Sequence, residues 1–480
     1  MSNLGESRFA TARMASHDPD SPEKLLEFMK TGWREEPLEV RARPEVPNYL
    51  RRRAAVSAAF PGETLIVPSG QRKVRANNTF YPFRPGSDFV YLTGDHDPDS
   101  VLVLRPGGDG VVYSRQRSSR ETGEFFLDRD GDLWVGRQRS LAEKTGELGV
   151  ETAPLAGLDA VLAGCVPGRT RVLRGVDPRV DAAVPPGEGD RELAWTIAEL
   201  KLVKDAWEVA QLRDAVEATV RGFEDVARVL PADRGVSARL VEGVFALRAR
   251  HDGNGVGYGS TVGTGAHATI LGWKPNNGAT VPGELLLMDM GVENANLYTA
   301  DVTRTLPVSG VFSPLQREVY DIVYASQQAG IEAVKPGVRF AEVHLTCMAV
   351  LAEGLAGLGV LPVSVEEALD PSSMLYRRWT LHGFGHMLGI DMHDCAAARP
   401  GKYREGELGE GNVLTVEPGL YFQADDELVP AELRGVGIRV EDDVLVTASG
   451  AVNLSEGLPR TAEEVESWLA AQREAGPRLP

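Results

Sequence analysis

The amino-acid sequence predicts an α/β protein of two domains, and three observations lead to that prediction. The chain has 480 residues, whereas a single domain usually takes about 100–200. Between residues 46 and 200, short apolar runs alternate with helical stretches, which is typical of an α/β domain. A turn-rich segment, Pro185-Pro-Gly-Glu-Gly-Asp190, then gives way to a long amphipathic helix, so we place the domain boundary between 190 and 205.

This division gives four segments. They are an N-terminal extension over 1–45, a first domain over 46–200, a second domain over 201–465 and a C-terminal tail over 466–480. The extension is mostly polar, and we expect one short helix in it, over 23–33.

The first domain is expected to begin with an Arg-rich helix from Tyr49. Apolar runs bounded by Gly, Pro and Asp are predicted to be strands; they cover 64–68, 88–94, 100–105 and 110–113. Helices are predicted around 139–148 and 158–162.

The second domain is predicted to start with a helix that ends before Pro231, because apolar residues recur there at three- and four-residue spacing. Ser313 and Gln316 form a capping box at the start of another helix. A further helix is expected over 340–358, and strands over 284–291, 413–422 and 437–446.

The composition limits the classes of partner. The net charge of −18 disfavours nucleic acid and anionic membranes as general partners. Three scattered cysteines lack CxxC spacing, so neither a disulfide framework nor a zinc ribbon is expected. The first residues hold no apolar signal segment, and no apolar run reaches 18 residues, so we expect a cytoplasmic protein without a membrane span.

A short segment between His382 and Asp394 contains three of the eight histidines, at 382, 386 and 393. Glycines at 383, 385 and 389 disfavour a helix, because each costs about 1 kcal/mol relative to Ala. We therefore expect an extended segment with His382 and His386 on one face, and with glycines that let another backbone or a ligand approach closely. The alternative is a set of solvated histidines, but their clustering favours a site.

Four acidic residues each end or interrupt an apolar, strand-like run: Asp289, Asp301, Glu417 and Glu441. Any one of them could simply face water at a strand end. A carboxylate that points inward is costly unless it is paired or binds a metal. Together with His386 they form an oxygen-rich donor set that suits manganese, cobalt, iron or zinc. Two ions about 3.5–4 Å apart could share a hydroxide and polarise a carbonyl, as in metal-assisted hydrolysis.

In this order, the five residues resemble the ligands of the metallopeptidase superfamily that contains methionine aminopeptidase and aminopeptidase P. Three motifs resemble its proline-specific branch: His382-Gly-x-Gly-His386, Thr415-Val-Glu-Pro-Gly419 and Gly437-Ile-Arg-Val-Glu-Asp442. A fourth motif, Tyr81-Pro-Phe-Arg-x-x-Ser-Asp88-Phe-x-Tyr-x-Thr-Gly94, resembles the N-terminal domain of that branch. The likeness covers about 46–465.

The resemblance implies an aminopeptidase P-like N-terminal domain followed by a "pita-bread" catalytic domain, in which two related α/β halves surround a curved antiparallel sheet. It also implies two divalent metal ions, most typically Mn²⁺, and release of the N-terminal residue from peptides with proline in second position. Asp289 would bind one ion, Asp301 and Glu441 would bridge, and His386 and Glu417 would bind the other.

The resemblance assigns further roles around the metals. Glu417 would also be the general base for a bridging water, His382 and His393 would contact the substrate carbonyl and the developing oxyanion, and Arg439 would hold the carboxylates. Asp88 would lie on the substrate side. Trp134 resembles an aromatic residue that a neighbouring subunit contributes in a homo-oligomer, a dimer or tetramer; packing in the core is the alternative.

Two departures from the family pattern stand out. Asp289 and Asp301 are one residue further apart than usual, which a hairpin tip absorbs easily. Gly272 stands where the family has a histidine that lines the substrate side of the metals. Its place could be taken by water, by a different substrate or by a neighbouring histidine, although His267 is five residues away and would point to the opposite face of a regular strand. This leaves two alternatives: a related dipeptidase or creatinase-like C–N hydrolase, and a non-catalytic binding module.

Overall fold

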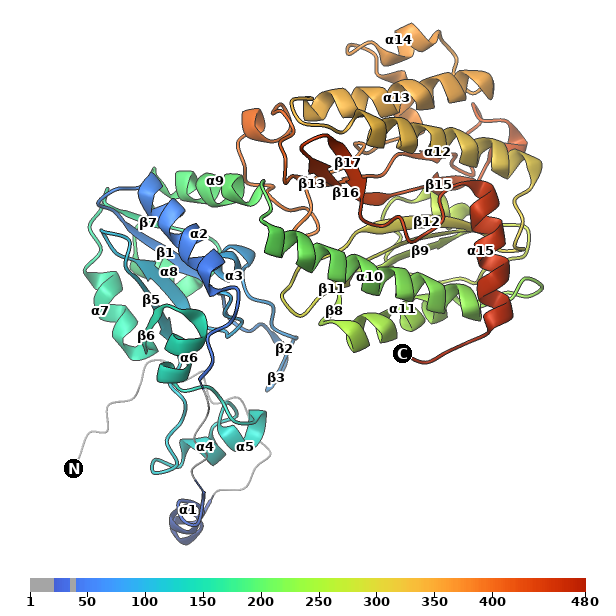
Figure 1. Ribbon diagram of the computed structural model, residues 1–480. Helices are drawn as coiled ribbons and strands as arrows, with labels where there is room; N and C mark the ends of the chain where they lie inside the picture. The colour runs from blue at the N-terminus through green and yellow to red at the C-terminus, as the bar shows by residue number, and fades with distance from the viewer. Residues whose placement is uncertain (1–20, 35–39) are drawn as a thin grey trace. The chain divides into compact units, whose positions relative to one another are not determined.

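The computed structural model describes residues 21–34 and 40–480 (Figure 1). These residues form two compact units that divide between Ile197 and Ala198.

The first unit is built on a five-stranded mixed sheet with the strand order β6-β5-β4-β1-β7. The strands are β1 (Thr64–Pro68), β4 (Val101–Leu104), β5 (Gly110–Ser114), β6 (Glu151–Pro154) and β7 (Thr170–Val172). β1 pairs antiparallel with β4 and parallel with β7. Apolar side chains of β1, β4 and β5 are fully buried, so the predicted strands at 64–68, 100–105 and 110–113 are confirmed.

Helices and one hairpin complete this unit. The helices are α1 (Glu23–Met29), α2 (Val46–Ala59), α3 (Ser87–Thr93), α4 (Glu124–Leu127), α5 (Asp132–Val135), α6 (Leu141–Leu148), α7 (Leu158–Ala163), α8 (Pro178–Ala183) and α9 (Asp190–Lys201), whose last residues enter the second unit. The hairpin joins β2 (Val74–Ala76) to β3 (Thr79–Phe80).

The strand predicted over 88–94 is wrong, because Ser87–Thr93 forms helix α3. Five consecutive residues of this helix, from Phe89 to Thr93, are buried. A short helix that is buried all round shows no polar face, so its sequence cannot be distinguished from that of a buried strand by periodicity. Gly94, in the left-handed conformation, ends the helix.

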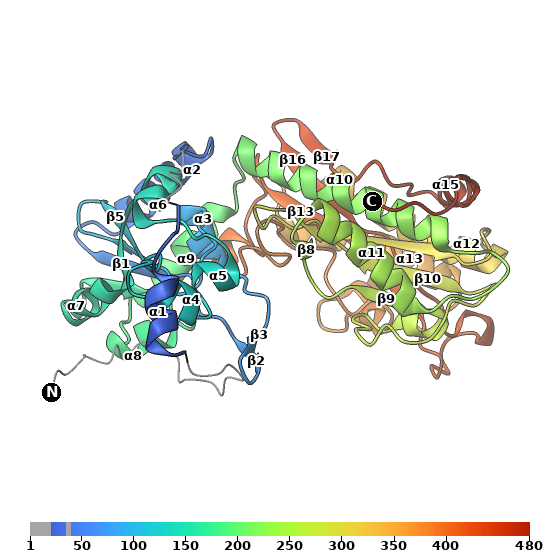
Figure 2. The same cartoon turned by 90° about the horizontal axis from the view of Figure 1, so that it is seen from below.

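The second unit has a layer of strands between two pairs of helices (Figures 1 and 2). α10 (Ala206–Val229) packs on α11 (Ala238–Asp252), and α12 (Pro314–Ala333) packs on α13 (Phe340–Gly357). The two pairs lie on opposite sides of the strands, as expected for a pita-bread domain. Ser313 and Gln316 form the predicted capping box of α12.

The strands of this unit form two three-stranded sheets and two ribbons. The sheets have the orders β12-β10-β9 and β13-β16-β17, and the ribbons are β11-β8 and β14-β15. The strands are β8 (Gly255–Val256), β9 (Thr261–Thr264), β10 (Leu285–Met290), β11 (Val292–Glu293), β12 (Val302–Pro307), β13 (Val413–Val416), β14 (Gly419–Tyr421), β15 (Gly437–Arg439), β16 (Asp442–Thr447) and β17 (Gly450–Asn453). The strands predicted over 284–291, 413–422 and 437–446 therefore exist, although the last two are each interrupted by an acidic residue.

The segment set apart as a C-terminal tail belongs to the second unit. Helix α15 (Ala462–Ala475) packs against α10 and buries Val465 and Leu469. Arg473 donates to the carbonyl oxygens of Leu230 and Val308. The helix has a capping box at Thr461 and apolar residues at four-residue spacing, which were the available signals in the sequence. The short helix α14 (Val365–Leu369) follows α13.

Within the described residues, α13 is the one helix whose length and apolar composition would suit a membrane span. Its residues Val343, Cys347, Met348 and Leu351 are fully buried in the core of the second unit.

Candidate metal centre

Four of the five predicted ligands come from strands or strand ends, in both halves of the second unit. Asp289 lies on β10 and Asp301 immediately precedes β12, whereas Glu417 follows β13 and Glu441 lies between β15 and β16. His386 lies in an irregular segment beside β13, where Met387 bridges Leu414.

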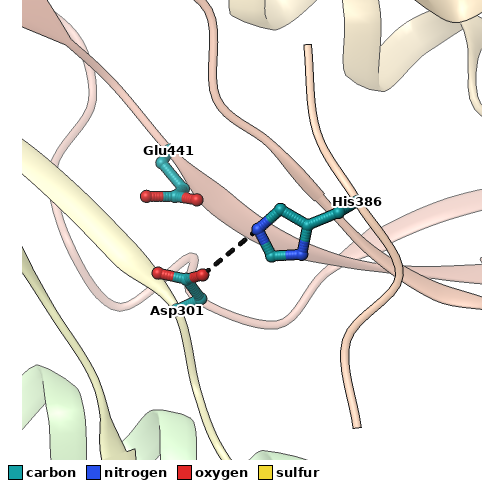
Figure 3. Close-up of side chains that lie close together, drawn as sticks. All are labelled: Asp301, His386 and Glu441. Atoms are coloured by element: carbon teal, nitrogen blue, oxygen red, sulfur yellow. Dashed lines mark ion pairs between the residues drawn. The ribbon is translucent and has the colours of Figure 1, made fainter. Parts of the chain in front are cut away.

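Figure 3 shows Asp301, His386 and Glu441 pointing toward one another, and one ligand atom from each of the three lies within 4.8 Å of the others. The Nε2 atom of His386 is 3.3 Å from Oδ2 of Asp301 and 3.6 Å from Oε1 of Glu417. The Nδ1 atom faces the Met387 carbonyl at 3.2 Å. Because a carbonyl oxygen only accepts, Nδ1 carries the proton of the neutral ring, and Nε2 is the nitrogen available to a metal.

Arg439 and Thr303 connect the carboxylates of the two halves. The Arg439 guanidinium donates to Oδ2 of Asp289 at 2.8 Å and to the Thr303 hydroxyl at 2.9 Å. The Thr303 hydroxyl donates to Oε2 of Glu441 at 2.6 Å. Arg439 is 3% exposed, so a buried cation sits beside the acids and orients two of them.

Two residues that the sequence did not predict hold Asp301. The Tyr258 hydroxyl donates to Oδ1 of Asp301 at 2.5 Å, and the backbone N–H of Asp301 donates to Asp443 at 3.1 Å. Tyr258 lies between two short strands, where no periodicity marks it. Asp443 did have a signal, because it is the third acid of Glu441-Asp-Asp443 at the start of a buried strand.

The crowded acids have perturbed pKa values. Burial raises the pKa of Asp289, and Arg439 only partly offsets this effect. Burial also raises the pKa of Glu417 to about 7, and burial together with the charge of Asp301 raises the pKa of Glu441 well above its ordinary value. Burial opposes the charge of His386, yet the hydrogen bond to Asp301 and the charge of Glu417 raise its pKa to about 9. The group as a whole therefore favours added positive charge, as protons or as metal ions.

The residues fit divalent metal ions. Oδ1 of Asp289 is buried and has no hydrogen-bond partner in the described part of the chain, so a good acceptor is left for a cation. Four carboxylates and one imidazole nitrogen match the oxygen-rich donor sets of Mn²⁺ and Zn²⁺ catalytic sites.

The histidine-rich segment is extended beside β13, as predicted, although it does not form a regular strand. Backbone hydrogen bonds join His386 O to Thr415 N, and Phe384 O to Glu417 N. A Cβ on Gly385 would lie 1.9 Å from the Thr415 carbonyl oxygen, so the predicted close approach of another backbone at a glycine is confirmed. Bends on both sides of this stretch limit the pairing to a few residues.

His382 is held by protein partners at both ring nitrogens. Nδ1 lies 2.8 Å from the Gly383 carbonyl, to which it donates, so Nε2 accepts from the Tyr421 hydroxyl at 2.7 Å. Arg439 in turn donates to the Tyr421 oxygen at 2.9 Å. Burial and the charge of Arg439 lower the pKa of His382 to about 3, so its ring is neutral. Tyr421, which the sequence did not predict, lies on β14, four residues after Glu417.

The remaining predicted residues differ in their surroundings. His393 is exposed, and its ring meets that of His386 edge-on at 4.4 Å. Gly272 lies in an exposed turn. In the first unit, Asp88 is partly buried in the first turn of α3, and Trp134 on α5 is 45% exposed, so core packing does not account for Trp134.

Comparison with known proteins agrees with this architecture. Residues 210–448 match metallopeptidase family M24, and residues 49–173 match the aminopeptidase P N-terminal domain. Aminopeptidase PepP of Pseudomonas aeruginosa superposes with a TM-score of 0.80 at 30% identity, covering 91% of this chain and 100% of that one. Zinc-substituted aminopeptidase P of Escherichia coli, in complex with product, gives 0.80 at 31% identity, covering 89% and 99%. Fold and site thus define a pita-bread metallopeptidase, a hydrolase that takes divalent metal ions.

The relatives found by sequence indicate which group of metallopeptidases the chain belongs to. Xaa-Pro aminopeptidase 1 of Streptomyces coelicolor is 50% identical over 461 residues, which cover 94% of this chain and 93% of the relative. Xaa-Pro aminopeptidase of Escherichia coli is 32% identical over 447 residues, which cover 88% and 97%. The chain belongs to the aminopeptidase P group of metallopeptidase family M24.

Proposed function

We propose that this protein is an Xaa-Pro aminopeptidase that uses two divalent metal ions, Mn²⁺ in the cell. The observation that carries the proposal is the cluster of Asp301, Glu417 and Glu441 around His386, with Arg439 holding Asp289 and one buried Asp289 oxygen left unpartnered. The 50% identity to an Xaa-Pro aminopeptidase supports the substrate class.

Asp289, Asp301, His386, Glu417 and Glu441 would hold the ions. When bound, such ions polarise the scissile carbonyl and lower the pKa of water. Glu417 would take the proton of the attacking water at a carboxylate oxygen. Arg439 would keep Asp289 oriented and offset the charge of the acids.

His393 is the histidine best placed to donate to the substrate oxygen. Among the described residues none hydrogen-bonds to its ring, and the ring is exposed beside His386. His382, whose nitrogens are both engaged, would orient Tyr421 and line the site, and would contact substrate only after it releases one partner.

Gly272 supports a second candidate, a related dipeptidase or creatinase-like hydrolase. A Cβ on Gly272 would meet no heavy atom within 4 Å, so the space that a histidine would fill is open to a different substrate. Nothing favours the binding-module alternative, because the ligand set is complete.

The test is a kinetic comparison after Mn²⁺ reconstitution. Peptides that begin Xaa-Pro are compared with matched Xaa-Ala peptides, Xaa-Pro dipeptides and creatine, and bound metal is counted per chain. We expect two ions per chain and a kcat/KM for Xaa-Pro peptides at least about a hundredfold above that for Xaa-Ala peptides. Preferred hydrolysis of the dipeptide or of creatine would replace the proposal with the second candidate.

A further inference from the structure

A fully buried charge cluster lies next in the chain to His393. Lys204, between α9 and α10, has a side chain with no exposed surface, and its Nζ is 2.9 Å from Oδ2 of Asp394. Lys201, the last residue of α9, approaches Oδ1 of Asp394 at 3.1 Å, and Asp394 is itself 1% exposed. All three residues belong to the second unit.

Burying such a cluster is expensive unless the charges are closely paired. Burial alone would raise the pKa of Asp394, but the two lysines hold it well below its ordinary value, so the carboxylate is charged. Replacing a buried ion pair with apolar residues is often neutral or stabilising. A gain in stability alone therefore does not explain this cluster. We infer that the cluster holds the loop around Asp394 in one position.

The loop around the cluster is closed tightly on Asp394. The backbone N–H of Asp394 donates to the Met387 carbonyl at 2.9 Å. A Cβ on Gly389 would lie 2.2 Å from Oδ2 of Asp394, so only glycine lets the carboxylate reach Lys204 past this point. The Gly389 carbonyl accepts from Thr299 N at 2.9 Å, which joins the loop to the segment before Asp301.

His393 has no such restraint of its own. Within the described chain, its ring makes no hydrogen bond, and its one aromatic contact is with the ring of His386. An exposed side chain whose neighbour in sequence is clamped in the interior takes its direction from that neighbour.

We propose that Lys204, assisted by Lys201, is a positioning residue that fixes His393 through Asp394. This inference rests on the proposed function for its kinetic consequence. The connector from α9 to α10 then belongs to the catalytic apparatus, although neither lysine touches the ligand carboxylates.

The test compares Lys204→Met with Arg248→Met in the full chain. Arg248 pairs with Asp225 at 2.7 Å, with side chains 8% and 3% exposed. Each substitution leaves its acid one remaining basic partner, Lys201 for Asp394 and Arg478 for Asp225, at 2.6 Å in the latter case. The two variants thus lose a comparable buried ion pair, and only one of these pairs lies beside His393.

Three measurements are made: kcat and KM on an Xaa-Pro peptide, metal content, and hydrogen exchange of residues 386–395. For Lys204→Met we expect kcat to fall at least about tenfold with KM within about threefold, because misplacing a catalytic group acts on the reaction step. Metal content should stay unchanged, since His386 is bonded separately to Thr415. Exchange over 386–395 should accelerate, and Arg248→Met should show none of these changes.

An equal loss of kcat in both variants, or unchanged exchange over 386–395 in Lys204→Met, would overturn the inference. If Lys204→Met does not fold, Lys201→Met, at the 6%-exposed end of the cluster, is read by the same criteria. A wild-type enzyme inactive on Xaa-Pro peptides would refute the proposed function, while the exchange comparison would still test the positioning role.

Discussion

Glu417 has two proposed roles, as a metal ligand and as the general base. Its carboxylate oxygens lie 3.6 Å from His386 Nε2 and 3.5 Å from His382 Nδ1. We expect Glu417→Ala to lower kcat by at least about a hundredfold, the usual scale for a lost general base, and to weaken metal binding. The measurements are single-turnover kinetics and metal content, with Asp425→Asn, an exposed acid eight residues further along the chain, as the control. More than a tenth of wild-type kcat with full metal content would contradict both roles.

Gly272 is the residue at which this chain departs from the family pattern. His267 does not lie on the regular strand that was assumed for it, because Gly265–Thr269 forms a short 3₁₀ helix. Its ring stacks on Trp273 at 4.0 Å, so it does not replace the missing histidine. The open space at Gly272, together with a backbone outside the left-handed region, leaves room for a larger side chain.

We therefore predict that Gly272→His raises kcat/KM on Xaa-Pro peptides at least about tenfold, mostly through kcat. A donor near the scissile carbonyl stabilises the transition state and is typically worth 10²–10³ in rate. Gly272→Ala is the matched control and should change little. A lower activity of Gly272→His on the best substrate would mark Gly272 as an adaptation to another substrate.

At the scale of elements, strand ends and the irregular segment around His386 bring the metal ligands together. The protons that these ligands carry must leave before metal ions bind. The ion-free pKa values of Glu417, about 7, and His386, about 9, mean that more protons occupy the site as the pH falls. We predict that the affinity for Mn²⁺ falls at least about tenfold between pH 8 and pH 6, with proton release on binding. Calorimetry in buffers of different ionisation enthalpy measures both quantities. A pH-independent affinity over this range would contradict the prediction.

Most elements near the site could be predicted because their sequences carry a local signal. The strand before Asp289 is a continuous apolar run, and the capping box at Ser313 predicts the start of α12. Buried helix α3 gave the wrong prediction because it shows no polar face. Tyr258 and Tyr421 were missed because their partners, Asp301 and His382, are distant in sequence, and one sequence holds no record of such contacts.

At the scale of the whole molecule, we predict a homo-oligomer that uses α4 and α5 as a contact surface. Four large apolar side chains are 45–54% exposed there: Leu127, Leu133, Trp134 and Val135. A cluster of exposed apolar side chains of this kind usually marks a site of interaction with another protein. Light scattering after size exclusion should give a dimer or tetramer that Trp134→Glu dissociates, whereas Leu345→Glu, 57% exposed on α13, should not. A monomeric wild type would refute the prediction.

The contact between α10 and α15 has a consequence for how the enzyme is made. Arg228 on α10 donates to Gln472 on α15 at 2.8 Å, across 244 positions in sequence. The ligands themselves span Asp289 to Glu441, with Arg439 bonded to Asp289 across 150 positions. Contacts this distant form late and slowly, because closing long loops costs conformational entropy before the contacts can stabilise the chain. A growing chain therefore cannot assemble the metal site from its early part, and competence for proteolysis arrives only with completed folding of the second unit.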